Sequence, residues 1–521
     1  MLSLLGTIVL VAVGILLIAT RYVARRVGHR RQAKALSCKP PRATVPAGFF
    51  GIDSFRDLKK AGKEKRFVGR IRELHEQYGT TYLMNILGTN CIFTIEPENI
   101  KAVLATQFTD FSFGRRHEVF GPLLGDGIFT LDGAGWSHSR GLLRPQFTRD
   151  QVADLDQLDI HVQRLIHAMP MDGTPFDIQE LFFRLTLDSA TDFLFGESVD
   201  SLVSATNNQI GISEKSVEGK RGFADAFNYS QDVLAQRGRA QGFYWLINPK
   251  EFREANKLVH QFVDYYVDKA IRYVESGKAR VPNEQGRYVF LEALALQTKD
   301  RKALRDQMLN ILLAGRDTTS SLLSSVFYFL ARNKRVWGTL RKEIVERFGT
   351  DAEKGADINF HSMKDLPYLR YVVNEALRLL PPVPANGRTA IRDTTLPVGG
   401  GPDGRSPIFI PKGTVVRYVV WALHTRRDIW GADADEFRPE RWAEFTPKGW
   451  EYLPFNGGPR ICLGQQYALT EASYVIIKLL QRFQALENAD SGPDRGSQPV
   501  MNHTLTQAHD KGVHVRLYTA N

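Results

Sequence analysis

A loop near the C-terminal end of the chain places a single cysteine among glycines. Residues 455–464 read FNGGPRICLG, and an apolar helix is predicted from roughly 465 to 483. Glycines let backbone N–H groups turn toward a sulfur atom, and the start of a helix stabilises an anion. The pattern favours a thiolate that binds a metal through Cys462. A buried free cysteine is the alternative for Cys462 considered alone.

A second group of polar residues lies inside a long predicted helix. Residues 304 to about 331 are apolar on nearly every side, which is typical of a buried helix. The central segment, 314–319, reads AGRDTT, and an acid with two hydroxyls is poor material for such a helix. Thr318 can donate to the carbonyl of Ala314 and open a local gap. The segment indicates chemistry at Asp317 and Thr318, with a satisfied internal polar cluster as the alternative.

Two further pairs of residues are ambiguous. Trp136 and Arg140 lie four apart on one helix face, where an indole N–H and a guanidinium could bind a carboxylate or simply pack together. Glu375 and Arg378 are an i, i+3 pair on a helix predicted over 369–380. Such pairs decorate ordinary helices, so their spacing alone proves nothing.

Hydrophobic periodicity indicates a mainly α fold with a smaller β region. Residues 81–87 and 91–95 alternate like strands, residues 151–280 form several amphipathic helices, and strands with hairpin turns follow Pro384. Residues 399–404 formally match G-x-G-x-x-G. They contain a proline and open no helix, so they predict a turn and not a dinucleotide site.

The N-terminus combines an apolar run with basic residues. Leu2 to Thr20 contains no charged residue, and a helix of this length spans about 28 Å, close to the thickness of a bilayer core. Residues 21–66 hold 14 Lys/Arg and 3 Asp/Glu, which equals the net charge of +11 for the whole chain. A membrane anchor with the body on the cytoplasmic side is therefore predicted, and a cleaved signal peptide is the alternative.

The rest of the chain is neutral overall, so nothing indicates a nucleic-acid partner. Three cysteines are too few for a disulfide framework, which favours a reducing compartment.

Four segments far apart in the chain together resemble the cytochromes P-450, the heme-thiolate monooxygenases. The resemblance is carried by a heme-binding signature (Phe455, Gly458, Arg460, Cys462, Gly464), an oxygen-activating helix segment (314–319), a buried Glu-Arg-Arg cluster (Glu375, Arg378, Arg441) and a propionate-binding helix (Trp136, Arg140). It covers essentially everything after the N-terminal apolar run.

The resemblance implies heme b as cofactor, with Cys462 as the axial thiolate that ligates the iron. Phe455 would shield the sulfur, and Gly464 would let the backbone pass close to the porphyrin. The propionates would be held by Arg460, Arg140, Trp136 and, ten residues after Arg378, Arg388.

The resemblance also implies the remaining roles. Asp317 and Thr318 would be catalytic and would deliver protons to dioxygen. Glu375, Arg378 and Arg441 would lock the loop that carries the cysteine. The expected organisation is a transmembrane signal-anchor helix (1–20), a basic and proline-rich linker (21–48) and one catalytic domain (49–521), in place of the roughly three domains that length alone suggests.

More narrowly, the chain is similar to the fungal alkane- and fatty-acid-hydroxylating branch, in residues 241–246, 310–319 and 394–397. This implies ω-hydroxylation of long-chain fatty acids or n-alkanes, with electrons from an NADPH-cytochrome reductase, at the cytoplasmic face of the endoplasmic reticulum membrane. Residues 385–387 are smaller than is usual in that branch and are expected to face the substrate, as is the loop 114–131. The alternatives are oxidation of a terpenoid or polyketide of fungal secondary metabolism, and a heme-binding sensor or isomerase.

Overall fold

The structure is a computed structural model that describes residues 4–147, 155–206, 217–277, 288–351, 355–492 and 498–519. Helices dominate it, as predicted. The helices are α1 (Leu4–Ala35), α2 (Ile52–Lys63), α3 (Phe67–Tyr78), α4 (Pro97–Lys101), α5 (Arg116–Leu124), α6 (Gly133–Leu143), α8 (Leu155–Ala168), α9 (Ile178–Phe195), α10 (Ser201–Thr206), α11 (Val217–Arg239), α12 (Lys250–Glu275), α13 (Phe290–Ala295), α14 (Arg301–Arg332), α15 (Lys334–Phe348), α16 (Pro367–Leu379), α17 (Val420–His424), α18 (Arg427–Trp430), α19 (Arg441–Glu444) and α20 (Gln465–Arg482).

The β region is built from short strands. They are β1 (Ala43–Thr44), β2 (Thr81–Ile86), β3 (Thr89–Thr94), β4 (Phe111–Ser112), β5 (Phe176–Asp177), β6 (Asn386–Ala390), β7 (Thr394–Gly400), β8 (Ser406–Ile410), β9 (Val415–Tyr418), β10 (Phe483–Asn488), β11 (Met501–His503), β12 (Gln507–His509) and β13 (His514–Thr519). The largest sheet has the order β1-β2-β3-β9-β6-β4, in which β1/β2 and β3/β9 are parallel pairs and the other pairs are antiparallel. Three smaller sheets pair β10-β13-β5, β11-β12 and β7-β8.

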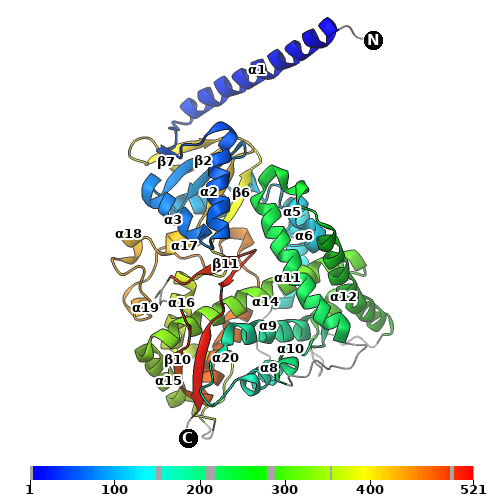
Figure 1. Ribbon diagram of the computed structural model, residues 1–521, viewed down its shortest axis with the longest axis vertical. Helices are drawn as coiled ribbons and strands as arrows, with labels where there is room; N and C mark the ends of the chain where they lie inside the picture. Colours follow the sequence, from blue (N-terminus) through cyan, green and yellow to red (C-terminus); the bar gives the residue numbers. More distant parts are fainter. Residues whose placement is uncertain are drawn as a thin grey trace.

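The long helix α14 crosses the middle of the body, with the main sheet above it, the helices α8, α9 and α10 below it, and α11 and α12 along the right-hand side (Figure 1). Its two halves pack into different apolar cores. Leu309 and Leu312 belong to a core shared with α11 and α12, whereas Val326 and Phe327 belong to a core shared with α16 and α20. The prediction of a buried helix from 304 to about 331 is confirmed.

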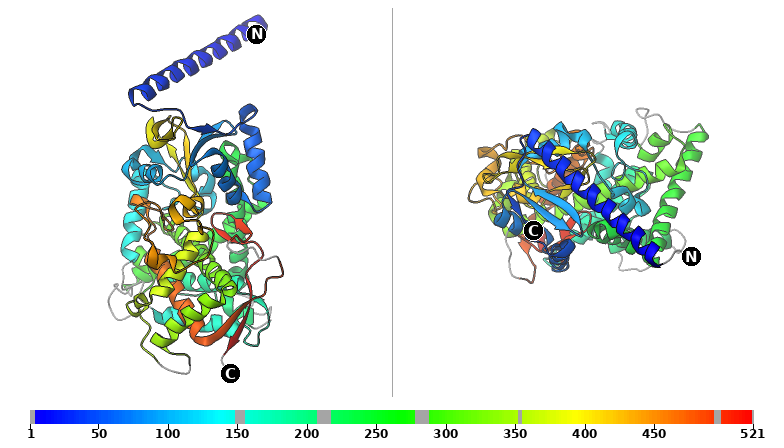
Figure 2. Two further views of the ribbon diagram at one scale, coloured as in Figure 1. Left: turned by 90° about the vertical axis from the view of Figure 1, so that its left-hand side faces the viewer. Right: turned by 90° about the horizontal axis from the view of Figure 1, so that it is seen from above.

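Helix α1 projects away from the body, and the C-terminus lies at the opposite end, as Figure 1 and the left view of Figure 2 show. The predicted apolar run and the first part of the predicted linker form one helix, which ends at Ala35. The Arg, Lys, Ala and Gln residues after Thr20 are good helix formers, and no proline precedes Pro40. Across the described part of the chain, no helix combines the length and the apolar character that crossing a membrane requires, so the expected transmembrane helix is not supported.

Beyond α1 the proline-bearing segment joins the small β7-β8 sheet. Arg42 N–H donates to the carbonyl of Gly399 at 2.8 Å, and Gly401 N–H donates to the carbonyl of Pro40 at 2.9 Å. Residues 399–404 therefore lie in a hairpin turn, as predicted, and this turn holds the connector against the body.

Candidate active site

A cavity of about 1240 Å³ lies between the middle of α14 and the loop 455–464, which we call the cysteine loop. The cavity is closed by α5, the following loop, β6, β9 and the start of α20. The predicted site residues that line it are Trp136, Arg140, Thr318, Arg388, Phe455, Arg460, Cys462 and Gly464. Residues separated by more than 300 positions are thus brought together as the sequence predicted.

The cysteine loop folds back on itself. Cys462 N–H donates to the carbonyl of Phe455 at 3.0 Å, which places the thiol at the N-terminal end of α20. Gly458 has a φ of 69°, and a Cβ there would lie 1.9 Å from the carbonyl oxygen of Leu104. Only glycine satisfies both demands, so the loop conformation depends on Gly458.

The Cys462 side chain is exposed to the cavity. Its surroundings act on the thiol in opposite directions. Burial raises the pKa of Cys462, whereas the backbone N–H of Gly464 and the guanidinium of Arg140 lower it. Among the described residues, no group of three or more His, Cys, Asp or Glu side chains could hold a metal ion. The described residues thus offer no site of three such protein ligands, and Cys462 suits a metal whose remaining ligands come from a macrocycle.

Gly464 has no conformational need to be glycine. Its φ is −85°, and a Cβ there would meet Phe147 Cε1 at an ordinary contact distance of 3.7 Å. The protein atoms thus leave a side chain enough room at Gly464. If a side chain at position 464 is excluded for lack of space, the group that excludes it must be bound in the cavity. This agrees with the prediction that the backbone at Gly464 passes close to a porphyrin.

Four guanidinium groups converge on one side of the cavity, and we call Arg116, Arg140, Arg388 and Arg460 the arginine cluster. Phe113 lies at its centre: the guanidinium carbons are 3.8 Å (Arg116), 4.1 Å (Arg460) and 4.5 Å (Arg388) from the centroid of its ring. Arg460 also lies 4.3 Å from the Trp136 ring.

The arginine cluster contains more positive charge than the protein neutralises. Arg460 donates to Asp132 Oδ1 at 2.7 Å, and among the described residues Asp132 is the acid that forms an ion pair with the cluster. Burial lowers the pKa of Arg460 to about 10, and Arg388 and Arg140 repel its charge. Arg388 Nε is buried and has no hydrogen-bond partner. These unsatisfied donors fit the two carboxylates of a porphyrin.

Arg116 was missed by the sequence analysis. It donates to Asn386 Oδ1 at 2.7 Å, the same atom that accepts from Arg388 Nη1 at 3.2 Å. Burial and the nearby Arg388 lower the pKa of Arg116 to about 9. The available signal was an arginine at the start of a helix inside the predicted substrate-facing loop 114–131, but nothing local connects that arginine to Arg388.

On α14, Thr318 and Asp317 lie on different faces. Thr318 Oγ1 donates to the carbonyl of Ala314 at 2.6 Å, as predicted, and its side chain lines the cavity. Asp317 does not line the cavity. Its carboxylate lies 3.5 Å from Arg316 Nη1 and beside Gln231 of α11, and burial raises its pKa. Successive helix residues point about 100° apart, and here this turn directs the Asp317 carboxyl toward α11 while Thr318 lines the cavity.

The Glu375–Arg378 pair is not an ordinary surface pair. Both side chains have an exposed fraction of 0%, and Arg378 donates to Glu375 at 2.9 and 2.8 Å. Arg378 also donates to the carbonyls of His424 and Ala434, at 2.8 and 2.6 Å, in the segment that precedes the cysteine loop. Arg441 completes the cluster with its Nε 3.4 Å from Glu375 Oε1. The three predicted cluster residues are therefore in contact, and they tie α16 to that segment.

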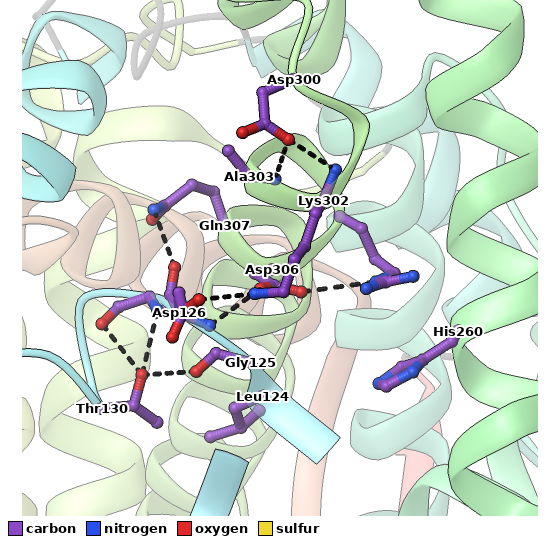
Figure 3. Close-up of polar contacts among 12 residues, drawn as sticks. Leu124, Gly125, Asp126, Thr130, His260, Asp300, Lys302, Ala303, Asp306 and Gln307 are labelled. Atoms are coloured by element: carbon purple, nitrogen blue, oxygen red, sulfur yellow. Dashed lines mark hydrogen bonds and ion pairs between the residues drawn. The ribbon is translucent and has the colours of Figure 1, made fainter. Parts of the chain in front are cut away.

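The start of α14 holds the loop between α5 and α6 (Figure 3). The buried carboxylate of Asp306 accepts from Asp126 N–H at 2.8 Å and from Lys302 Nζ at 2.8 Å. A Cβ on Gly125 would lie 2.1 Å from the Asp306 carboxyl, so the loop packs directly on this acid. About one turn of helix later, Asn310 accepts from Phe129 N–H at 3.0 Å. Sequence analysis assigned no role to Asp306 or Asn310.

The remaining segment expected to face substrate, residues 385–387, also lines the cavity. It forms the start of β6, and its neighbours Pro382, Val383 and Pro384 line the same wall. Small side chains at this wall leave space opposite α14.

Comparison with known proteins agrees with this geometry. The cytochrome P450 family model matches residues 46–509. Cytochrome P450 52A6 of Candida tropicalis is 50% identical over 495 residues, covering 93% of each chain. Cytochrome P450 52A12 of Debaryomyces hansenii is 52% identical over 479 residues, covering 90% of this chain and 91% of the relative. A crystal structure of the cytochrome P450DA heme domain shares the fold, with a TM-score of 0.74 at 21% identity over 93% of this chain and 99% of that chain.

Proposed function

Because the chain belongs to the cytochrome P450 family and is therefore a heme-iron monooxygenase, we propose that it hydroxylates long-chain fatty acids or n-alkanes at or near the terminal carbon. The predicted resemblance to the family and to its fungal alkane- and fatty-acid-hydroxylating branch is confirmed by these relatives. The observation that carries the proposal is that Cys462, Thr318 and the arginine cluster line one cavity whose surface is mostly apolar.

The cofactor proposed for this cavity is heme b. Cys462 would ligate the iron, and the arginine cluster together with Trp136 would hold the two propionates. Phe455 would cover the sulfur side, and Gly464 would leave room for the ring. When bound, the heme supplies the oxidation chemistry, in which one atom of dioxygen enters the substrate and the other becomes water.

The proton-handling residues proposed on α14 have separate tasks. Thr318 Oγ1 faces the cavity and, with its own hydrogen donated to Ala314, offers lone pairs that can orient a donor there. Asp317 lies behind the helix, where burial raises its pKa and Arg316 and Gln231 oppose the rise, and we propose it as the source of protons. Delivery from Asp317 to the cavity then requires an intervening water or a rotation of the Asp317 side chain.

Glu375, Arg378 and Arg441 are proposed to have a structural role. None of the three lines the cavity, and their hydrogen bonds join one another, backbone groups of the segment 424–438 and the side chains of Asp433 and Trp442. They hold the segment from 424 to 442 against α16 and so position the cysteine loop that follows it.

Members of this family receive electrons from a redox partner and act on lipophilic substrates. We propose that the partner here is an NADPH-cytochrome reductase and that the protein is attached to the endoplasmic reticulum membrane, with the catalytic domain (49–521) in the cytoplasm. Helix α1 supports attachment, because Ile15, Leu16 and Ile18 are 64%, 64% and 72% exposed and would be covered by lipid. Under this proposal, residues 1–20 are the membrane-attached segment, residues 21–48 are the linker and residues 49–521 are the catalytic domain.

Attachment is tested by removing residues 1–35 and comparing the two forms by membrane fractionation. The full chain is expected in the membrane pellet and the shortened chain in the supernatant. Equal distribution of the two forms would exclude α1 as the attachment site.

A second candidate substrate is a polycyclic terpenoid or polyketide, favoured by the small side chains at residues 385–387 on the cavity wall. The two candidates are separated by titrating the heme-loaded protein with aliphatic and polycyclic ligands and following the Soret band. An aliphatic response followed by ω-hydroxylated product in a reconstituted reductase assay supports the first candidate. A response to polycyclic ligands alone would refute it.

The oxygenase assignment has its own test. The reduced, carbon-monoxide-bound protein is expected to show the thiolate-type Soret band, and Cys462→Ser is expected to abolish it. A band that survives this substitution would exclude Cys462 as the ligand, and unaltered protein that never shows the band would refute the assignment.

A further inference from the structure

Three guanidinium groups outside the arginine cluster also line the cavity: those of Arg115, which is exposed, of Arg417, which lies beside Cys91, and of Arg239. Arg239 is the last residue of α11, and its side chain is half-buried in the cavity wall. It donates from Nη2 to the backbone carbonyl of His503. Among the described residues, no carboxylate lies within ion-pair distance of Arg239. Asp232, about two turns earlier on α11, is the acid close enough to act on its charge. Burial lowers the pKa of Arg239, which marks a cation without full compensation.

The surroundings of Arg239 are positive. Lys65 lies close enough to act on the same groups, and its own ion pair is with Asp510 at 3.3 Å. His503 adds no negative charge: burial, Arg239 and Lys65 lower its pKa to about 3, so it is neutral. Lys59 and Lys63, on helix α2, also line the cavity.

A partly desolvated guanidinium without a carboxylate is unfavourable, and an anion that binds there gains charge-assisted hydrogen bonds. The arginine cluster is accounted for by the heme propionates under the proposed function, but Arg239 is not. Most of the remaining lining is apolar, including Phe120, Leu124 and Ile311. A ligand that suits both features has one anionic end and a long apolar body.

We propose that Arg239 binds the carboxylate of the substrate, so that the physiological ligand class is long-chain fatty acids and not n-alkanes. The inference rests on the proposed function. With the carboxylate held at the end of α11, the chain extends through the apolar part of the cavity and its methyl end reaches the side lined by Cys462 and Thr318. Such an arrangement selects attack at the terminal end of the chain.

The test uses the full-length, heme-loaded protein and three ligands of one length: dodecanoate, methyl dodecanoate and dodecane. Dissociation constants are measured by calorimetry, so the readout does not depend on turnover. Unaltered protein is expected to bind dodecanoate most tightly. Arg239→Gln is expected to weaken dodecanoate about 10- to 100-fold, the usual value of a charge-assisted hydrogen-bonded contact, and to leave dodecane unchanged. Arg239→Lys keeps the charge and is expected to recover part of the affinity.

Arg253→Gln is the control, because Arg253 is exposed on α12, does not line the cavity and donates to the backbone carbonyl of Asn248. It is expected to bind all three ligands as the unaltered protein does. Weaker binding of dodecanoate in Arg253→Gln alone, or equal weakening of dodecanoate and dodecane in Arg239→Gln, would overturn the inference. If none of the three ligands binds the unaltered protein, the proposed function fails as well. If all bind with one affinity and Arg239→Gln changes nothing, only the carboxylate site fails.

Discussion

Glu471 is a buried acid beside the cavity whose replacement predicts a specific change in pH dependence. It lies on α20 with an exposed fraction of 2%, and Ser189 Oγ of α9 donates to its Oε1 at 2.5 Å. Thr319 of α14 interacts with the same carboxyl. No Lys or Arg of the described residues forms an ion pair with it. Burial raises the pKa of Glu471 to about 7, against the opposing effects of Ser189, Thr319 and His161.

The direction in which stability changes with pH follows from the number of protons that Glu471 binds in the folded and in the unfolded chain. Between pH 4.5 and 7 the carboxyl of Glu471 is ionised in the unfolded chain but still protonated in the folded protein, so stability falls as pH rises through this window. Above about pH 7 both states are ionised and the decline ends. A shift from 4.5 to about 7 corresponds to about 3 kcal/mol across the window. Glu471→Gln stays neutral and removes this decline.

Thermal unfolding of both forms, followed by circular dichroism from pH 4.5 to 8, measures the effect. With an unfolding entropy of about 2 cal/mol/K per residue, 3 kcal/mol corresponds to roughly 3 °C in a chain of this size. The variant is expected to match the unaltered protein near pH 4.5 and to melt about 3 °C higher at pH 7.5. Glu346→Gln, at an exposed position on α15, is the control and is expected to show no pH-dependent difference. A constant offset of Glu471→Gln at every pH would refute the reasoning.

Three further predictions concern the site and its support. Glu375→Ala leaves the fully buried Arg378 without its carboxylate, so the free energy of unfolding is expected to fall by about 3–5 kcal/mol. Denaturant unfolding measures this loss. The control, Glu254→Ala at an exposed position, should lower the free energy of unfolding by under about 1 kcal/mol. Gly458→Ala places a Cβ within 1.9 Å of the Leu104 carbonyl oxygen at a residue whose φ is 69°, so heme incorporation is expected to fall sharply. The control is Gly449→Ala, because Gly449 also has a positive φ but has open space around it, and this variant should incorporate heme normally. Thr318→Ala is expected to raise peroxide released per NADPH consumed and Thr318→Ser to restore coupling; unchanged coupling in the alanine variant would count against a role for the Thr318 hydroxyl.

The elements that carry the site were predictable because their signals are local. The helix expected over 304 to about 331 is α14 (Arg301–Arg332), and the helix expected from roughly 465 to 483 is α20 (Gln465–Arg482). The Thr318–Ala314 hydrogen bond was also predictable, since it joins residues one turn apart. Periodicity, residue type and short spacing determine such features without reference to the rest of the fold.

The features that sequence analysis missed depend on distant contacts. Arg116 enters the arginine cluster because β6 places Asn386 and Arg388 beside the start of α5, and no local pattern contains that pairing. Asp317 was expected to act with Thr318, but the helix turns its carboxyl toward α11. The N-terminal helix was predicted to end at Thr20 because the residues change there from apolar to basic. The helix in fact ends at Ala35, because the residues after Thr20 also have a high helix propensity.

The polar residues of α14 explain how one buried helix serves two ends of the cavity. At its start, Asp306 and Asn310 accept from backbone N–H groups of the loop between α5 and α6, whose residues Ile128 and Phe129 line the cavity. In its middle, Thr318 faces the cavity. A buried polar group is costly unless it is satisfied, so the hydrogen bonds of Asp306 and Asn310 favour one rotation of α14 about its axis. Because Asp306 and Thr318 lie on the same helix, one element positions both the loop between α5 and α6 and the Thr318 hydroxyl. Differences in which substrates the cavity accepts are then expected to arise at the wall formed by residues 385–387 and at the carboxylate contact proposed for Arg239.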